Sequence, residues 1–226
     1  MSVQPNNHCG NLDFATKFLN EILQKLEVSK KNPNALVQAW LLSAVIEKTR
    51  TVSILITNKW HGGVLEVCRS QMEAAADLLL LLRDDEHMKF LLQRQNKTIA
   101  SFSEQAKRRP VAMPGVAATM KLEPHRKAVK SATQSIKSKL SDQHNQPIVD
   151  SVALAGLEED FYRYLCSFTH NNLNTLKIRY ADSIPAGGGL GSLTDDLLKS
   201  VVSQLCSSAL KILDAFAERK KRLNLQ

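Results

Sequence analysis

The sequence has no apolar run close to the roughly 20 residues that a helix needs to cross a bilayer. Its longest continuous apolar stretch, residues 78–82, is bounded by Asp77 and Arg83. The first residues, MSVQPNNHCGNLD, also lack the basic and apolar regions of a secretory signal. We therefore expect a cytoplasmic protein that has no membrane segment.

Cysteine is scarce, and its spacing excludes the usual metal and redox motifs. Cys9, Cys68, Cys166 and Cys206 show no C-x-x-C pair, and three of them fall in helical patterns, which predicts small, reduced core residues. No carboxylate cluster and no set of His and Cys ligands is evident. The glycine-rich residues 187–191 lack the Lys-Ser/Thr of a phosphate-binding loop. The sequence thus predicts no metal and no other cofactor.

Helical patterns account for almost the whole chain. Hydrophobic residues make up 43% of the 226 positions, which is enough for a substantial core. We expect an all-α bundle of about six to seven helices in a single domain, 1–226, with a basic and less regular insertion near 105–148. The expected helices span about 11–28, 33–57, 64–82, 84–108, 121–140, 151–172 and 192–222.

Capping residues and apolar periodicity predict the ends and buried faces of these helices. Asn32 and Pro33 suit the N-cap and first position of a helix, and His61-Gly62-Gly63 marks a turn or an interruption. Residues 64–82 are apolar nearly all round, which predicts the central helix. The predicted core or interface side chains include Phe14, Phe18, Trp40, Ile54, Trp60, Leu154, Leu157, Phe161, Leu165 and Phe168.

Positive charge is concentrated in the middle of the chain. Twelve Lys and Arg residues but only two acids lie between His87 and Lys139, so this segment carries +10 and the rest of the chain −2. Such a segment favours a polyanionic partner, with RNA or DNA ahead of a membrane surface. A solvated arm without a partner is the alternative, because aromatic residues that stack on single strands are few there. The candidate nucleic-acid contacts are Lys107, Arg108, Arg109, Arg126, Lys127 and Lys130.

Three polar residues form a candidate catalytic group late in the chain. Arg163, Ser167 and His170 occur at i, i+4 and i+7, on one face of a helix. An Arg that binds phosphate and a His that exchanges protons are sufficient to cleave a phosphodiester without a metal. The alternative is structural, because the helix dipole alone favours a His in the last turn.

A second polar pair, Arg69 and Glu73, lies four residues apart in the otherwise apolar helix near 64–82. Arg69 is either a further cation in the same cleft, held by Glu73, or part of a buried ion pair that fixes helix register. In the structural alternative the pair bonds to the hydroxyl of Tyr162 or to His170. We favour this role, because so apolar a helix leaves little room for substrate.

The combination R-S-x-x-E at 69–73 and F-Y-x-Y-L-x-S-x-x-H at 161–170 resembles an uncharacterised bacterial all-helical family. The resemblance covers roughly residues 35–90 and 155–215. That family in turn resembles the HEPN superfamily (higher eukaryotes and prokaryotes nucleotide-binding), whose motif is Arg, four to six residues, then His. Here the motif is Arg163-x6-His170, followed by Asn171.

The resemblance implies a four- or five-helix core, homodimers, and metal-independent cleavage of RNA in phage defence or toxin–antitoxin systems, with a cognate protein partner. His170 would be the general acid and base and Arg163 the phosphate ligand. Ser167, Asn171 and Tyr162 would orient these groups. The alternative is a non-catalytic interaction protein in which Arg69, Glu73, Tyr162 and His170 form a buried network and the basic segment docks a partner.

Overall fold

The structure is a computed structural model that describes residues 8–26, 32–95, 148–169 and 193–224. By its internal contacts the chain divides into two units, one formed by Met1–Asp85 with Pro147–Gln226 and the other by Glu86–Gln146. The described residues form helices and no strand, which confirms the expected all-α bundle of about six to seven helices. The single domain stays a prediction.

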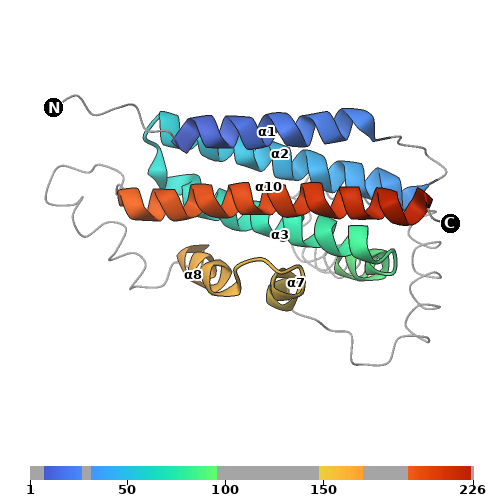
Figure 1. The fold of residues 1–226 in the computed structure, drawn as a ribbon. Helices are drawn as coiled ribbons and strands as arrows, with labels where there is room; N and C mark the ends of the chain where they lie inside the picture. Colours follow the sequence, from blue (N-terminus) through green and yellow to red (C-terminus); the bar gives the residue numbers. More distant parts are fainter. Residues whose placement is uncertain (1–7, 27–31, 96–147, 170–192, 225–226) are drawn as a thin grey trace, which may run out of the picture. The chain divides into compact units, whose positions relative to one another are not determined.

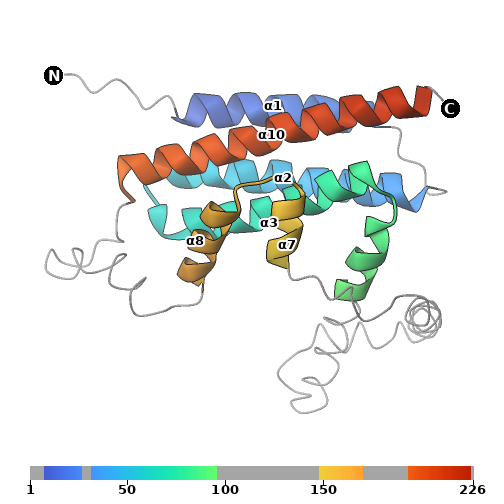
Figure 2. The same cartoon turned by 60° about the horizontal axis from the view of Figure 1, so that its bottom comes forward.

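The first unit is built on a bundle of four long helices. They are α1 (His8–Lys25), α2 (Pro33–Thr57), α3 (Val64–Arg83) and α10 (Asp195–Asn224). α2 packs against α1 and α3, and α10 closes the bundle by packing against both α3 and α1 (Figure 1). Two short helices, α7 (Ile148–Leu154) and α8 (Glu159–Thr169), pack against α3 (Figure 2). α3 therefore has neighbours on most of its circumference.

The position of α3 confirms it as the central helix. Of its 20 residues, 13 are buried. They include Cys68, where burial raises the pKa of the thiol to about 12. Such a thiol stays protonated and behaves as a small apolar side chain. The four cysteines are free, as expected, although Cys9, Cys166 and Cys206 are only partly buried.

Most of the predicted helix ends agree with the structure. The side chain of Asn32 accepts a hydrogen bond from the Ala35 amide at 3.1 Å, which caps α2. His61–Gly63 forms a short 3-10 turn, η1, ahead of α3. α1 begins at His8, earlier than expected. Its first turn is fastened to the last turn of α2, where Cys9 Sγ lies 3.2 Å from Thr57 Oγ1.

The prediction of one continuous helix at 151–172 was wrong, because the helix is interrupted between α7 and α8. Gly156 has φ +73°, and the Leu157 and Gly156 amides donate to the carbonyls of Val152 and Ala153 at 3.1 and 2.8 Å. This pattern is a Schellman motif, which requires a left-handed residue that glycine supplies at least cost. The break turns Leu154 toward solvent, whereas Leu157 and Leu165 are buried as predicted.

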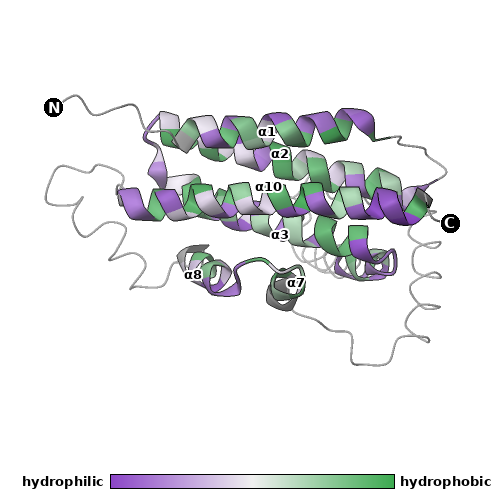
Figure 3. Cartoon of the chain, in the orientation of Figure 1, coloured by the Kyte–Doolittle hydropathy of each residue, from purple (hydrophilic) through white to green (hydrophobic). Residues whose placement is uncertain are grey.

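Several large apolar residues expected in the core are exposed. α1 buries Leu12, Ala15 and Leu19, while Phe14 and Phe18 lie on its outer side with their ring centroids 4.7 Å apart. Figure 3 shows hydrophobic and hydrophilic residues mixed along the visible faces of α1 and α10. The exposed set also includes Trp40, Ile54 and Trp60. Placing Phe14, Phe18 and Ile54 in the core was wrong. Trp40 and Trp60 were predicted as core or interface residues, and the interface role stays a prediction.

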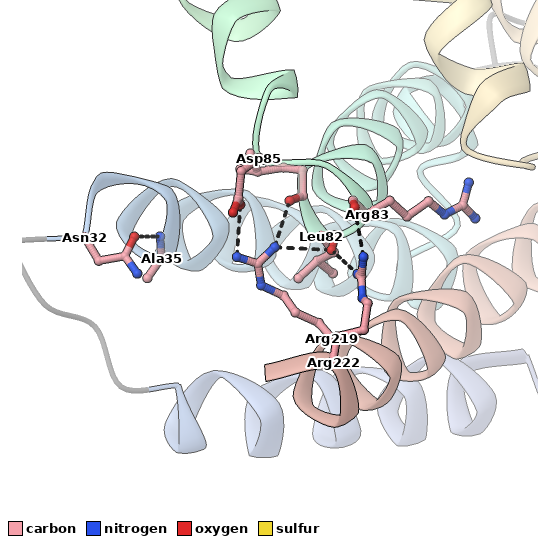
Figure 4. A network of polar contacts seen from close by, with 8 residues as sticks. Asn32, Ala35, Leu82, Arg83, Asp85, Arg219 and Arg222 are labelled. Carbon is pink, nitrogen blue, oxygen red and sulfur yellow. Dashed lines mark hydrogen bonds and ion pairs between the residues drawn. The ribbon is translucent and has the colours of Figure 1, made fainter. Parts of the chain in front are cut away.

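Arginines from α10 complete the C-terminal end of α3. Arg222 donates to the carbonyls of Leu82 and Arg83 at 2.8 and 3.1 Å (Figure 4). Arg219 donates to Asp85 at 2.9 Å and to the last carbonyls of α3. The last carbonyls of a helix have no partners within it, and cations there also complement the helix dipole. α10 is thereby fastened to the end of the central helix.

Little of the second unit lies within the described residues. A helix begins at residue 87, directly after the three acids Asp84-Asp85-Glu86, and is described to residue 95. The helix expected at 121–140 and the basic insertion near 105–148 fall almost entirely outside the described residues. Among the helices that are described, none has both the length and the apolar character that crossing a membrane demands.

Candidate functional site

α8 turns two neighbouring side chains of the predicted site in different directions. Tyr162 is only 1% exposed and packs in the core, together with Leu165 one turn later. Arg163 lies on the outer side of the helix, with 60% of its side chain exposed. Consecutive helical residues are about 100° apart, so both cannot share one face. The predicted site is therefore divided into an inner group, formed by Arg69, Glu73 and Tyr162, and an outer group, formed by Arg163 and Ser167.

The inner group joins α8 to α3 through one carboxylate oxygen. The Tyr162 hydroxyl donates to Glu73 Oε1 at 2.8 Å, and Arg69 Nη2 lies 2.9 Å from the same oxygen. The Arg69 guanidinium also lies 6.0 Å from the centroid of the Tyr162 ring. The Arg69 and Glu73 side chains are 25% and 24% exposed, so the pair is partly buried rather than fully buried as expected. The structure thus shows the predicted contact with Tyr162, whereas the structural role of the pair stays a prediction.

The electrostatics of the inner group favour a fixed hydrogen-bonding pattern. Burial, followed by the hydrogen bond to Glu73, raises the pKa of Tyr162. Burial lowers the pKa of Arg69, but the Tyr162 hydroxyl and the charge of Glu73 outweigh it and raise that pKa overall. Tyr162 therefore remains a donor and Arg69 a cation at any physiological pH.

The outer group is organised by a residue that the sequence analysis did not select. Glu159 lies one helical turn before Arg163 and accepts hydrogen bonds from Arg163 Nε and Nη2 at 2.8 and 2.5 Å. The Ser167 hydroxyl donates to the Tyr164 carbonyl at 2.7 Å. His170 and Asn171 lie outside the described residues. The Glu159-x3-Arg163 spacing is a standard i, i+4 pair and was visible in the sequence.

A second unpredicted contact involves His61 in η1. Its Nδ1 accepts a hydrogen bond from the Leu193 amide at 3.1 Å, which fixes Leu193, two residues before α10, to the turn that precedes α3. Burial and the charge of Lys59 lower the pKa of His61. The neutral ring is the form that accepts this hydrogen bond. No local pattern joins positions so distant in sequence.

The remaining predicted residues do not extend this site. The basic set 107–130 lies outside the described residues. A polar depression of about 450 Å³ lies between α1 and α2, and the described site residues are not among those that line it, namely Asp13, Thr16, Lys17, Asn20, Gln24 and Arg50. Within the described ranges, no three His, Cys, Asp or Glu side chains gather as metal ligands would.

Comparison with known proteins places the chain in a family. The model of a family of unknown function, DUF5677, matches residues 36–184, which is more than half of the chain. The protein therefore belongs to this family. The matched region contains both the inner group on α3 and α8 and the outer group on α8. No curated protein and no solved structure matches the chain significantly.

Proposed function

We propose that this member of a family of unknown function is an HEPN-like protein that binds RNA and cleaves it without a metal. It would act in the cytoplasm as a homodimer, in phage defence or in a toxin–antitoxin system with a cognate protein partner. The observation that carries the proposal is the exposed Arg163 on α8, seven residues before His170. The segment with charge +10 between His87 and Lys139 supports a polyanionic substrate.

Each residue has a distinct task in the proposed reaction. His170 removes the proton of the ribose 2′-hydroxyl or supplies one to the leaving oxygen. Arg163, oriented by Glu159, stabilises charge on the phosphate, and Ser167 and Asn171 orient the reacting groups. Tyr162 acts indirectly, because its hydroxyl is bonded to Glu73 and holds α8 against α3.

The test is incubation of the protein with labelled single-stranded RNA and tRNA in EDTA, followed by analysis of the product ends. Wild type should leave 2′,3′-cyclic phosphate or 3′-phosphate ends. His170→Ala and Arg163→Ala should lower cleavage by at least about 100-fold, as expected for a general acid–base and a phosphate ligand. Arg50→Ala, which removes an exposed arginine from α2, should cleave like wild type. Equal cleavage by His170→Ala and wild type would contradict the mechanism.

A non-catalytic interaction protein is the second candidate. It is favoured by the inner group, in which Arg69, Glu73 and Tyr162 bond to one another across two packed helices. In this case the basic segment docks an acidic protein or a nucleic acid without cleaving it. No cleavage by wild type, together with a loss of thermal stability in His170→Ala, would support this candidate.

A further inference from the structure

We propose that Tyr164 is a stacking platform for an unpaired base of RNA, placed beside the phosphate ligand Arg163. This inference rests on the proposed function and adds a substrate contact to it, namely the stacking of an unpaired base on Tyr164. The relevant features are the exposure of Tyr164, the support beneath its ring, and its position relative to Arg163 and Ser167 on α8.

The Tyr164 ring is both accessible and held in place. It is 39% exposed, and it stacks against Phe161 with the ring centroids 6.3 Å apart and the planes inclined by 25°. Phe161 is itself packed against the hydrophobic core, so it anchors Tyr164 to the body of the bundle. A ring fixed in advance loses little conformational entropy when a base stacks on it.

The neighbours of Tyr164 suit the rest of a nucleotide. Arg163 precedes it, and two hydrogen bonds to Glu159 fix the plane of the Arg163 guanidinium. Ser167 lies in the next turn, where its hydroxyl is bonded to the Tyr164 carbonyl. Arg163 and Tyr164 point about 100° apart around the helix, and both are exposed. They can therefore contact a phosphate and a base at neighbouring positions of one RNA strand, and stacking accepts any of the four bases.

Charge on α8 limits where the RNA strand can run. The first turn holds Glu159 and Asp160, and Glu158 precedes it. Arg163 offsets the charge of Glu159, and the remaining negative charge disfavours phosphates beyond Arg163 at this end of the helix. Tyr164 and Ser167 lie further along, toward His170. A strand stacked on Tyr164 would thus pass along the C-terminal half of α8, where the proposed general acid and base follows.

The experiment measures binding of full-length protein in a His170→Ala background, so that RNA remains intact. A fluorescein-labelled single-stranded RNA and the same strand annealed to its complement are the two probes. Because stacking on an aromatic side chain contributes about 1–3 kcal/mol per base, adding Tyr164→Ala should weaken single-strand binding by about 5- to 150-fold. Tyr164→Phe keeps the ring and should bind within about twofold of the background protein.

Two controls separate stacking from a general loss of structure or surface. Phe14→Ala removes a ring that is 64% exposed from another aromatic pair, on α1, and should leave binding unchanged. A single-stranded probe with 2-aminopurine reports stacking directly, through quenching that Tyr164→Ala should abolish. Thermal unfolding of each variant confirms that the bundle is intact.

The outcomes also distinguish this inference from the proposed function. Single-strand binding that Tyr164→Ala leaves unchanged would overturn the stacking platform and leave RNA binding in place. Equal weakening of single-strand and duplex binding would overturn it as well, because a duplex offers no unpaired base. Failure of the background protein to bind either probe would overturn both proposals.

Discussion

The bond between Tyr162 and Glu73 allows a direct test of whether the inner group is structural. Tyr162→Phe removes the hydroxyl that donates to Glu73 Oε1 at 2.8 Å and keeps the buried ring. A hydrogen bond to a charged group contributes about 1.5–3 kcal/mol. Glu73 keeps its bond to Arg69 and is partly exposed, so a water molecule can hydrogen-bond to Glu73 in place of the tyrosine and offset part of the lost stability. We therefore expect the free energy of unfolding to fall by about 1–1.5 kcal/mol.

Urea and thermal unfolding measure this change. For a chain of this length the expected loss lowers Tm by about 2–6 °C, with no change in the urea m-value. Tyr162→Ala also removes the buried ring, so this variant should lower the free energy of unfolding by about 4–6 kcal/mol. Tyr164→Phe on the same helix is the matched control, and it should change stability by no more than about 0.5 kcal/mol.

A double-mutant cycle with Glu73→Gln assigns the effect to the bond itself. If Tyr162 and Glu73 interact as described, their coupling energy should be at least about 0.5 kcal/mol. Stability of Tyr162→Phe within about 0.3 kcal/mol of wild type, or strict additivity in the cycle, would refute the reasoning. The inner group would then not be what holds α8 against α3.

Two further predictions concern pH and salt. The folded-state pKa of His61 is lowered, so its bond to Leu193 stabilises the protein fully above about pH 6.5, and this stability is lost as pH falls below that value. Between pH 7.5 and pH 5 the Tm of His61→Gln should fall less than the Tm of wild type. An identical fall in Tm would contradict the role of His61. Replacing the three basic residues at 107–109 by Ala should reduce the slope of log Kd against log salt for single-stranded RNA by about two, at roughly 0.7 per phosphate contact. An unchanged slope would exclude these residues from the RNA interface.

The fold was predictable wherever its determinants are local. Asn32 with Pro33 marks the start of α2, and the all-round apolar character of residues 64–82 marks the central helix, because both signals lie within a few turns. The orientation of α1 was not predictable. It has two apolar stripes, one with Phe14 and one with Leu12, and packing against α2 and α10 decides which is buried.

The candidate site was predictable to a similar extent. The i, i+4 spacing of Arg69 and Glu73 indicated their pairing, and Tyr162 was one of two partners proposed for it. Helical spacing separates Tyr162 from Arg163, but which of the two faces α3 followed only from how α8 docks on it. The Schellman break at Gly156 separates α8 from α7. Periodicity read through residue 156 as one helix therefore placed Leu154 in the core wrongly, whereas Leu157 and Leu165 were placed correctly.

The capping of α3 by α10 has a consequence for the order of folding. The groups that complete the central helix, Arg219 and Arg222, are separated from its last carbonyls by 137 to 140 positions in sequence. During synthesis, α3 and everything encoded between it and α10 emerge first, so the end of α3 is hydrated until the last helix arrives. Contacts this distant in sequence slow folding. The contacts between α10 and the C-terminal end of α3 thus form last. A chain truncated before residue 219 should retain its local helices but lack the hydrogen bonds that cap α3.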